Sequence, residues 1–118
     1  MGFLSKDLIL SADDLKKEEI DVPEWGGKVC IRTMRGEERD SFEQSIFDGQ
    51  GTVKDKLDNV RARLLVLVLV DEAGNRLFTD QDIPALGKKS AGVLDRLFEV
   101  AKRLNRISRK DVEELAGE

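Results

Sequence analysis

Apolar residues recur at steps of three and four through the middle of the chain, at Leu57, Val60, Leu64 and then Leu67 or Val68. This helical spacing leads directly into seven uninterrupted apolar residues, LLVLVLV, at 64–70. The pattern predicts one helix over about 54–70 that is buried on all sides along its last two turns. The pattern favours this helix, but the alternation of Leu and Val over 65–70 also suits a buried strand, which stays open as the alternative.

The clearest amphipathic helix is predicted over 90–105, where one continuous apolar face is formed by Val93, Leu94, Leu97, Phe98, Ala101 and Leu104. Shorter helices are predicted over about 35–47, 80–86 and 109–116. Hydroxyl side chains near the start of these helices can accept a hydrogen bond from an unpaired N–H of the first turn: Thr33, Thr79, Ser90 and Ser108. By the same reasoning, Ser5 and Ser11 predict two short helical turns over KDLIL and ADDLKKEE.

The segment 18–34 has the alternation of a small antiparallel hairpin. Apolar and polar residues alternate in EEIDVPE and again in KVCIRTM, and Trp25-Gly26-Gly27 between them supplies a turn. Pro23 has no N–H to donate to a neighbouring strand, so the first strand is expected at a sheet edge. The expected fold is mainly α with a small N-terminal β-hairpin (α+β), in a single domain over 1–118.

Composition removes several classes of function. The 118 residues are 40% hydrophobic and 37% charged, with a net charge of −4, which argues against a general nucleic-acid coat because that role needs a cationic surface. Without histidine, Ser-His-Asp and Cys-His catalysis and His-ligated zinc are impossible. No enzyme activity, cofactor or metal is therefore predicted. A longest apolar run of seven is too short to span a bilayer, and the single Cys30 fits a reducing cytoplasm.

The acidic loop DEAGN at 71–75 resembles a calcium loop only superficially. Such a loop needs oxygen ligands at its first, third and fifth positions and Gly at the sixth. Counted from Asp71, the third position is Ala73 and the sixth is Arg76, and Gly74 is out of place. The loop is interpreted as a turn, in which Gly and Asn tolerate positive φ.

A basic run allows a different class of function. It contains five positive charges without an intervening acid, from Lys102, Arg103, Arg106, Arg109 and Lys110. Between two capped helices, this run at 102–110 could belong to a helix-turn-helix, so a small DNA-binding or regulatory protein is the alternative prediction. The opposing interpretation is pairing with the acidic segment 13–24, within or between subunits.

Phrases spread along the chain resemble the tail assembly chaperones of long-tailed phages and prophages. These phrases are VPEWGG, VRARL, DEAGNRLF and ALGKKSAGVLDRLF, and the resemblance covers about residues 3–115. It implies a protein that binds the long, helical tape-measure protein and helps the tail-tube protein assemble around it. This chain would be the shorter of two products, the longer one arising by ribosomal frameshifting and recruiting the tube protein. The implied location is the cytoplasm of the bacterial host and not the mature virion, and self-association along the client is plausible.

A chaperone of this kind needs apolar residues left over from core packing. The expected contact residues are Trp25, Phe42 and Phe47. Trp25, at the hairpin turn, has two possible roles: closing a small core, or anchoring a partner, since Trp is enriched among interface hot spots.

Overall fold

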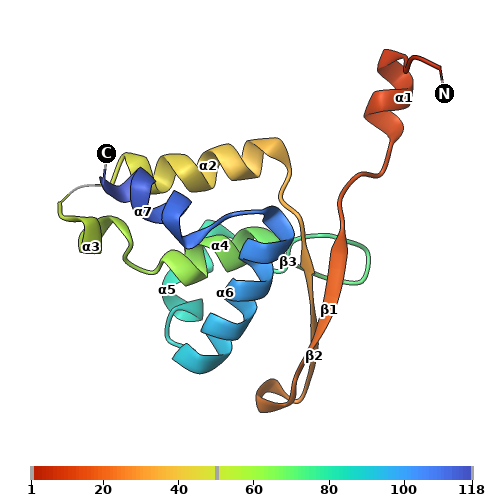
Figure 1. Cartoon of the computed structure of the whole chain (residues 1–118). Helices are drawn as coiled ribbons and strands as arrows, with labels where there is room; N and C mark the ends of the chain where they lie inside the picture. The colour runs from red at the N-terminus through yellow and green to blue at the C-terminus, as the bar shows by residue number, and fades with distance from the viewer. Residues whose placement is uncertain (1, 50, 118) are drawn as a thin grey trace.

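The helices lie to one side of a long β-hairpin, and a short N-terminal helix stands away from both (Figure 1). The computed structural model describes residues 2–49 and 51–117, without the side chains of Arg109, Val112 and Glu113. In chain order the elements are α1 (Lys6–Ser11), β1 (Lys17–Val22), η1 (Pro23–Trp25), β2 (Gly27–Arg32), α2 (Gly36–Phe47), α3 (Val53–Lys56), α4 (Val60–Val68), β3 (Leu69–Val70), η2 (Asp80–Asp82), α5 (Ile83–Leu86), α6 (Ala91–Asn105) and α7 (Arg109–Gly117). The predicted fold class, mainly α with a small N-terminal hairpin, is confirmed.

The hairpin pairs β1 with β2 in antiparallel register, from Lys17 opposite Arg32 to Val22 opposite Gly27. Pro23 does not lie within the strand but opens the 3-10 turn η1, where its fixed φ suits the first position. The turn ends at Gly26, whose φ of 78° favours glycine. β1 is an edge strand, as predicted from the proline.

A third strand forms at the end of the apolar run, where a strand over 65–70 was the alternative to a helix. β3 pairs antiparallel with β2, so β2 is the central strand of the order β1-β2-β3. On its other side, Val70 forms an isolated bridge with Arg76, and the N–H of Leu77 donates to the carbonyl of Leu69 at 3.0 Å. The turn at 71–75 therefore folds back to cover the β3 edge.

The prediction of a single helix over 54–70 is wrong in two places, at an internal break over 57–59 and at its C-terminal end. A turn separates α3 from α4, with Asn59 at φ 52°, and the chain becomes extended from Leu69. The guanidinium of Arg63 donates to the carbonyls of Lys56 and Asp58 at this break. The prediction of burial is confirmed, because all residues of 64–70 are buried.

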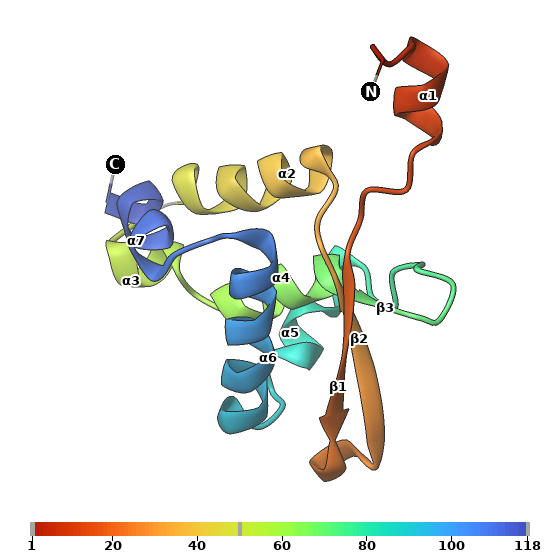
Figure 2. The ribbon, with the colours of Figure 1, turned by 45° about the vertical axis from the view of Figure 1, so that its right-hand side comes forward.

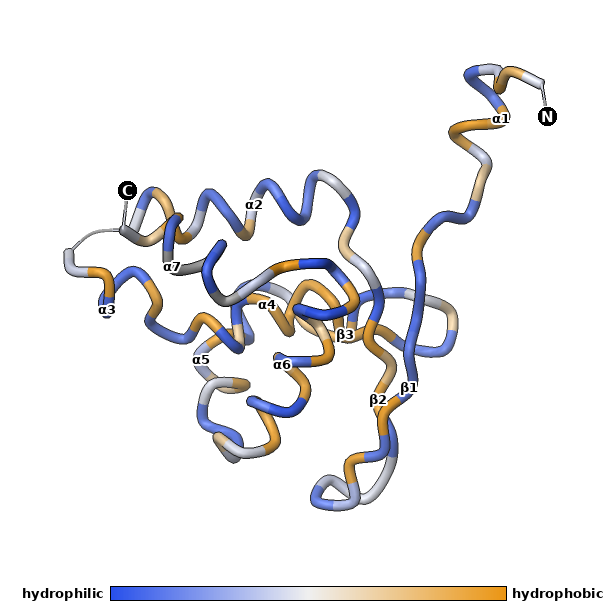
Figure 3. The backbone as a smooth tube through the Cα atoms, in the orientation of Figure 1, coloured by the Kyte–Doolittle hydropathy of each residue, from blue (hydrophilic) through white to orange (hydrophobic). Residues whose placement is uncertain are grey.

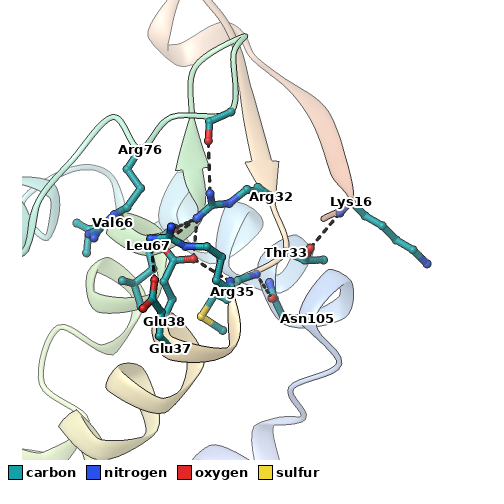
Figure 4. Close-up of polar contacts among 12 residues, drawn as sticks. Lys16, Arg32, Thr33, Arg35, Glu37, Glu38, Val66, Leu67, Arg76 and Asn105 are labelled. Carbon is teal, nitrogen blue, oxygen red and sulfur yellow. Dashed lines mark hydrogen bonds and ion pairs between the residues drawn. The ribbon is translucent and has the colours of Figure 1, made fainter. Parts of the chain in front are cut away.

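Two arginines explain why α4 ends where it does. Arg32 Nη2 donates to the carbonyl of Leu67 at 3.2 Å, and Arg76 Nε donates to the carbonyl of Val66 at 2.9 Å (Figure 4). These are carbonyls of the last helical turn, which has no further turn to accept from. Because arginine side chains satisfy these two carbonyls, the helix can end at Val68, and Leu69 and Val70 can pair with β2.

Arg32 also joins β2 to α2 through a buried ion pair (Figure 4). Its Nη2 lies 2.7 Å and 2.9 Å from the two carboxylate oxygens of Glu38, and both side chains are nearly inaccessible. The same carboxylate accepts from the N–H of Arg35 at 2.8 Å and so satisfies the start of α2. Sheet, helix start and the end of α4 thus converge on one arginine.

Two of the predicted helix caps are wrong. Thr33 does not cap α2: its hydroxyl accepts from the N–H of Lys16 at 3.0 Å, and its N–H donates to the Lys16 carbonyl at 2.9 Å. Ser11 ends α1 instead of starting a second turn, and residues 12–16 form neither helix nor strand. For Thr33, pairing between the start of β1 and the end of β2 replaces the local helix start. Ser90 precedes α6 as predicted but makes no capping bond with its side chain.

The caps at Ser5, Thr79 and Ser108 form as predicted. The carboxylates of Asp111 and Asp55 accept from the N–H groups of Ser108 and Thr52 at 3.0 Å and 2.9 Å. These backbone hydrogen bonds hold the pKa of both carboxyl groups below their ordinary value of 3.8.

A pH dependence follows from the cap at Asp111. The folded-state pKa is the lower one, so the unfolded chain binds more protons just below pH 3.8 and the contribution to stability is lost as the pH falls through that region. Asp111→Asn is expected to make the loss of unfolding free energy in acid shallower. Urea titrations between about pH 3 and 6 measure this, with Asp13→Asn in the exposed 12–16 segment as control. An unchanged acid dependence in Asp111→Asn would contradict the assignment.

The core is built around α4. It packs against α6, whose buried face carries most of the residues predicted for it, and against α5 and α2. The largest fully buried side chains are Val22, Ile31, Ile46, Leu64, Leu65, Val66, Val68, Leu69 and Leu97.

Candidate partner-binding surfaces

The structure separates the three residues expected to contact a partner. Phe42 is 2% exposed and packs in the core, so its side chain is not available at the surface of this fold. Phe47, the last residue of α2, is 50% exposed. Trp25 is half-buried in the hairpin turn, away from the end of α2 in both views (Figures 1 and 2). Phe42 and Ile46 share one face of α2, whereas Phe47 lies one residue further round the helix, outside the core.

Trp25 lines an apolar pocket of about 390 Å³ between the hairpin turn and α5, which we call the Trp25 pocket: Trp25, Phe78, Asp82, Ala85, Leu86 and Lys89. Lys89 Nζ lies 5.9 Å from the centroid of the Trp25 ring, within the range of a cation–π interaction. Leu86 is buried, whereas Ala85 is exposed at the rim. The pocket can accept apolar side chains between one acidic and one basic group.

A larger groove of about 670 Å³ separates α3 and the start of α4 from α6, which we call the α3 groove: Lys54, Leu57, Asp58, Asn59, Val60, Arg61, Asp95, Phe98, Glu99 and Lys102. Its apolar part is Leu57, Val60 and Phe98. Lys102 Nζ lies 4.9 Å from the Phe98 ring centroid and 2.9 Å from Glu99. An apolar floor between charged rims is the form of site that accepts an amphipathic helix.

Two further exposed apolar residues lie at the end of α2 and the start of α3. Phe47 ends α2, and Val53 begins α3, the helix that contributes Lys54 and Leu57 to the groove. The end of α2 and the start of α3 lie at the same end of the molecule in both views (Figures 1 and 2). Phe47 and Val53 are thus exposed apolar side chains on two contacting helices, outside the lining of the α3 groove itself.

The most exposed apolar side chains belong to a segment that sequence analysis did not select. We call residues 2–15 the N-terminal arm. It comprises α1 with its flanks, and five of its six large apolar side chains are more than half exposed: Phe3, Leu4, Leu8, Ile9 and Leu10. These hydrophobic positions stand apart from the body of the protein (Figure 3). The sequence feature that could have indicated this arm is an apolar cluster followed by a polar linker without helical or strand periodicity.

Three cations of the basic run are paired with acidic side chains. Lys102 is buried and paired with Glu99, and Arg103 lies 2.6 Å from Glu18. Lys110 lies 3.8 Å from Glu114, and the Arg109 side chain is outside the described residues. The contact between Arg103 and Glu18 is the predicted pairing of the basic run with the acidic segment.

Nearby, Arg96 and Glu24 form a second pairing of the acidic segment with α6, at 3.0 Å. The hydrogen bond from Arg96 lowers the pKa of Glu24. Both ion pairs hold the hairpin against α6. Each uses an arginine of α6 that would otherwise be available to bind a nucleic acid phosphate.

The acidic loop is a turn. The Asp71 carboxylate accepts from the N–H groups of Ala73 and Asn75 at 2.9 Å and 3.0 Å, and Gly74 adopts a φ of 90°. Within the described residues, no group of three or more acidic or Cys side chains is placed to hold a metal ion. Across the same residues, every helix is too short or too polar to cross a membrane.

Apolar grooves on a charged exterior define a binding protein, and comparison with known families agrees. The sequence model of the family described as phage tail assembly chaperone matches residues 5–118. The chain therefore belongs to the phage tail assembly chaperone family, which is a family of chaperones and not of enzymes.

A solved structure supports the fold. The tail assembly chaperone of bacteriophage HK97 is similar with a TM-score of 0.60 and 23% sequence identity. The similarity covers 76% of this chain and 85% of the HK97 chain. No curated protein sequence matches the chain.

Proposed function

We propose that this protein binds the helical tape-measure protein, keeps it soluble, and helps the tail-tube protein assemble around it. It would act in the cytoplasm of the bacterial host and leave before the virion is complete. A longer, frameshifted form would recruit the tube protein. Membership of the tail assembly chaperone family supports a tail protein as the client.

The α3 groove is the observation that carries the proposal. Its apolar floor is made by Leu57, Val60 and Phe98. We infer that Phe47 and Val53, which are exposed on the contacting helices α2 and α3, enlarge the surface that a client contacts. An amphipathic client helix buries its apolar stripe in such a groove and leaves its polar face in water. The charged residues of the rim, including the ion pair of Arg61 with Asp95, favour one orientation of the client over others.

The composition of the exterior fits the same role. Charged residues make up 37% of the chain, while the apolar core is closed around α4. Covering the apolar stripe of a client with a protein of this kind replaces an aggregation-prone surface by a charged one.

Substitution at Phe47 tests the proposal. Phe47→Asp is expected to weaken client binding by about 2 kcal/mol, roughly 30-fold, if Phe47 is an interface hot spot. Co-expression with the tape-measure protein of the same phage should then leave most of the client insoluble. Gln44→Asp, on the exposed side of the same helix, is the matched control and should keep the client soluble. A client that is equally soluble with both variants, or without the chaperone, would refute the proposal.

A further inference from the structure

A cationic cleft lies apart from the α3 groove and from the Trp25 pocket. It has a volume of about 570 Å³ and is formed by the start of α2, the end of α6 and the residues that precede β1. We call it the arginine cleft. Its cationic side chains are Lys16, Arg35, Arg39 and Arg106, and its one acid is Asp14. In a chain with a net charge of −4, this is a local excess of positive charge.

Asn105 fixes the shape of the arginine cleft from within the fold. It is buried, and its side-chain Oδ1 accepts from the N–H of Met34 at 2.7 Å. Its backbone carbonyl accepts from Arg39 Nη1 at 2.8 Å. Figure 4 shows Asn105 beside Thr33 and Arg35, in the segment that joins β2 to α2. Because these bonds tie α6 to the start of α2, the cleft is formed before a partner arrives, which lowers the entropic cost of binding.

Arg35 stands at a position where arginine does not help the fold. It is the N-cap of α2, where Ser, Thr, Asn or Asp would accept a hydrogen bond from the first turn, and a guanidinium has no acceptor. Its charge also opposes the positive end of the helix dipole. It lies 3.2 Å from Glu37 and 3.6 Å from Glu38, yet more than half of its side chain remains exposed.

Arg106 is a second exception of the same kind. It ends α6 in the left-handed conformation, at φ 55° and ψ 44°. Glycine is the usual residue there, because it has no Cβ to penalise this backbone. Residues that break a local rule without a gain for the fold are concentrated at functional sites. Arg35 and Arg106 are far apart in the sequence, and both line the arginine cleft.

We propose that the arginine cleft binds an acidic peptide segment of a partner protein, in which carboxylates flank an apolar residue. Charge complementarity carries the assignment, since guanidinium groups bind carboxylates through paired N–H···O hydrogen bonds. Leu15 and Leu104, both partly exposed, supply apolar surface in the walls of the same cleft. The peptide thus finds cations for its carboxylates and leucines for its apolar side chain.

The surroundings favour a short acidic peptide over a nucleic acid. The exposed acids Glu37 and Asp40 follow Arg35 on α2. A phosphate backbone that continued beyond the cleft would be repelled by these carboxylates, whereas a peptide can end within the cleft. The arginine cleft shares no lining residue with the α3 groove, so a helical client and an acidic peptide can be bound together.

Fluorescence anisotropy on the purified full chain tests the proposal, with a labelled synthetic peptide in which four glutamates flank a central leucine. Binding should be saturable and should weaken with added salt. Arg35→Ser and Arg106→Gly should each weaken it by about tenfold or more, because each removes a charge-assisted hydrogen-bond donor. Their thermal unfolding midpoints should stay at or above wild type, because each introduces a residue type that favours its helix end.

Lys88→Gln is the matched control for charge. Lys88 is exposed and lies outside the arginine cleft, so this variant should bind the peptide as wild type does. The same peptide with glutamines in place of glutamates should not bind, and a DNA duplex should not displace the acidic peptide.

Several results would overturn the proposal. One is the absence of saturable binding to wild type, and another is an equal loss of binding in Lys88→Gln. Equal binding of the glutamine peptide, or displacement by DNA, would remove the preference for an acidic peptide. Unfolding midpoints below wild type in both arginine variants would assign these arginines to the fold. A lower mass of Arg106→Gly in light scattering would assign the cleft to a second copy. The proposed function is tested separately, by client solubility with Phe47→Asp.

Discussion

Replacing Glu38 by Ala is expected to lower the free energy of unfolding by about 3–5 kcal/mol. The substitution leaves the Arg32 guanidinium buried without its carboxylate, and it removes the acceptor for the N–H of Arg35. Arg32 Nε is already buried without a hydrogen-bond partner, so the substitution adds further unpaired N–H groups to the same buried guanidinium. Urea unfolding at neutral pH measures the change.

Glu37→Ala is the control for this substitution. Glu37 is the preceding acid in α2, pairs with Arg35 at 3.2 Å, and has 74% of its side chain exposed, against 5% for Glu38. An exposed pair of this kind contributes about 0–1 kcal/mol. Equal losses for the two variants would contradict the role of Glu38. The double variant Arg32→Met/Glu38→Leu should recover only part of the loss: no unpaired charge remains buried, but the carbonyl of Leu67 and the N–H of Arg35 lose their hydrogen-bond partners.

Truncating Leu97 to Ala is expected to cost about 2–5 kcal/mol of unfolding free energy. Leu97 is 0% exposed on the face of α6 that packs against α4, so truncation leaves a cavity in addition to the lost transfer energy. The same urea titration measures it.

Leu77→Ala makes the same chemical change at a side chain that is 51% exposed, and it should cost much less. A loss below about half a kcal/mol at Leu97 would mean that this face of α6 is not part of the packed core.

The helices that could be predicted are those whose signals are local. α6 has a long apolar face at helical spacing, and Val93, Leu94, Leu97, Phe98 and Ala101 are all buried as expected. The cap at Ser108 also formed, because Ser and Asp three residues apart can satisfy two N–H groups without help from the rest of the chain. Thr33 has an equally suitable hydroxyl, but the strand pairing at Lys16 competed for it.

The candidate binding surfaces also combine features that the sequence predicts with features that only tertiary packing decides. Aromatic residues could be selected from the sequence, but only packing decides that Phe42 turns inward and Phe47 outward. The arm carries five exposed apolar side chains that were overlooked, because its separation from the body depends on the segment 12–16, which forms neither helix nor strand. The α3 groove joins residues about forty positions apart, such as Val60 and Phe98.

The sequence by itself determined that 64–70 is buried, that 90–105 is an amphipathic helix, and that a hairpin lies near the N-terminus, because apolar periodicity and turn residues act locally. It also carried the phrases that resemble the family. Only the tertiary structure decided that the apolar run divides into a helix and a strand at Leu69. Both conformations bury the same side chains, so hydrophobicity does not choose between them. The choice is made by Arg32 and Arg76, which satisfy the carbonyls of Leu67 and Val66, and by β2, which pairs with Leu69 and Val70.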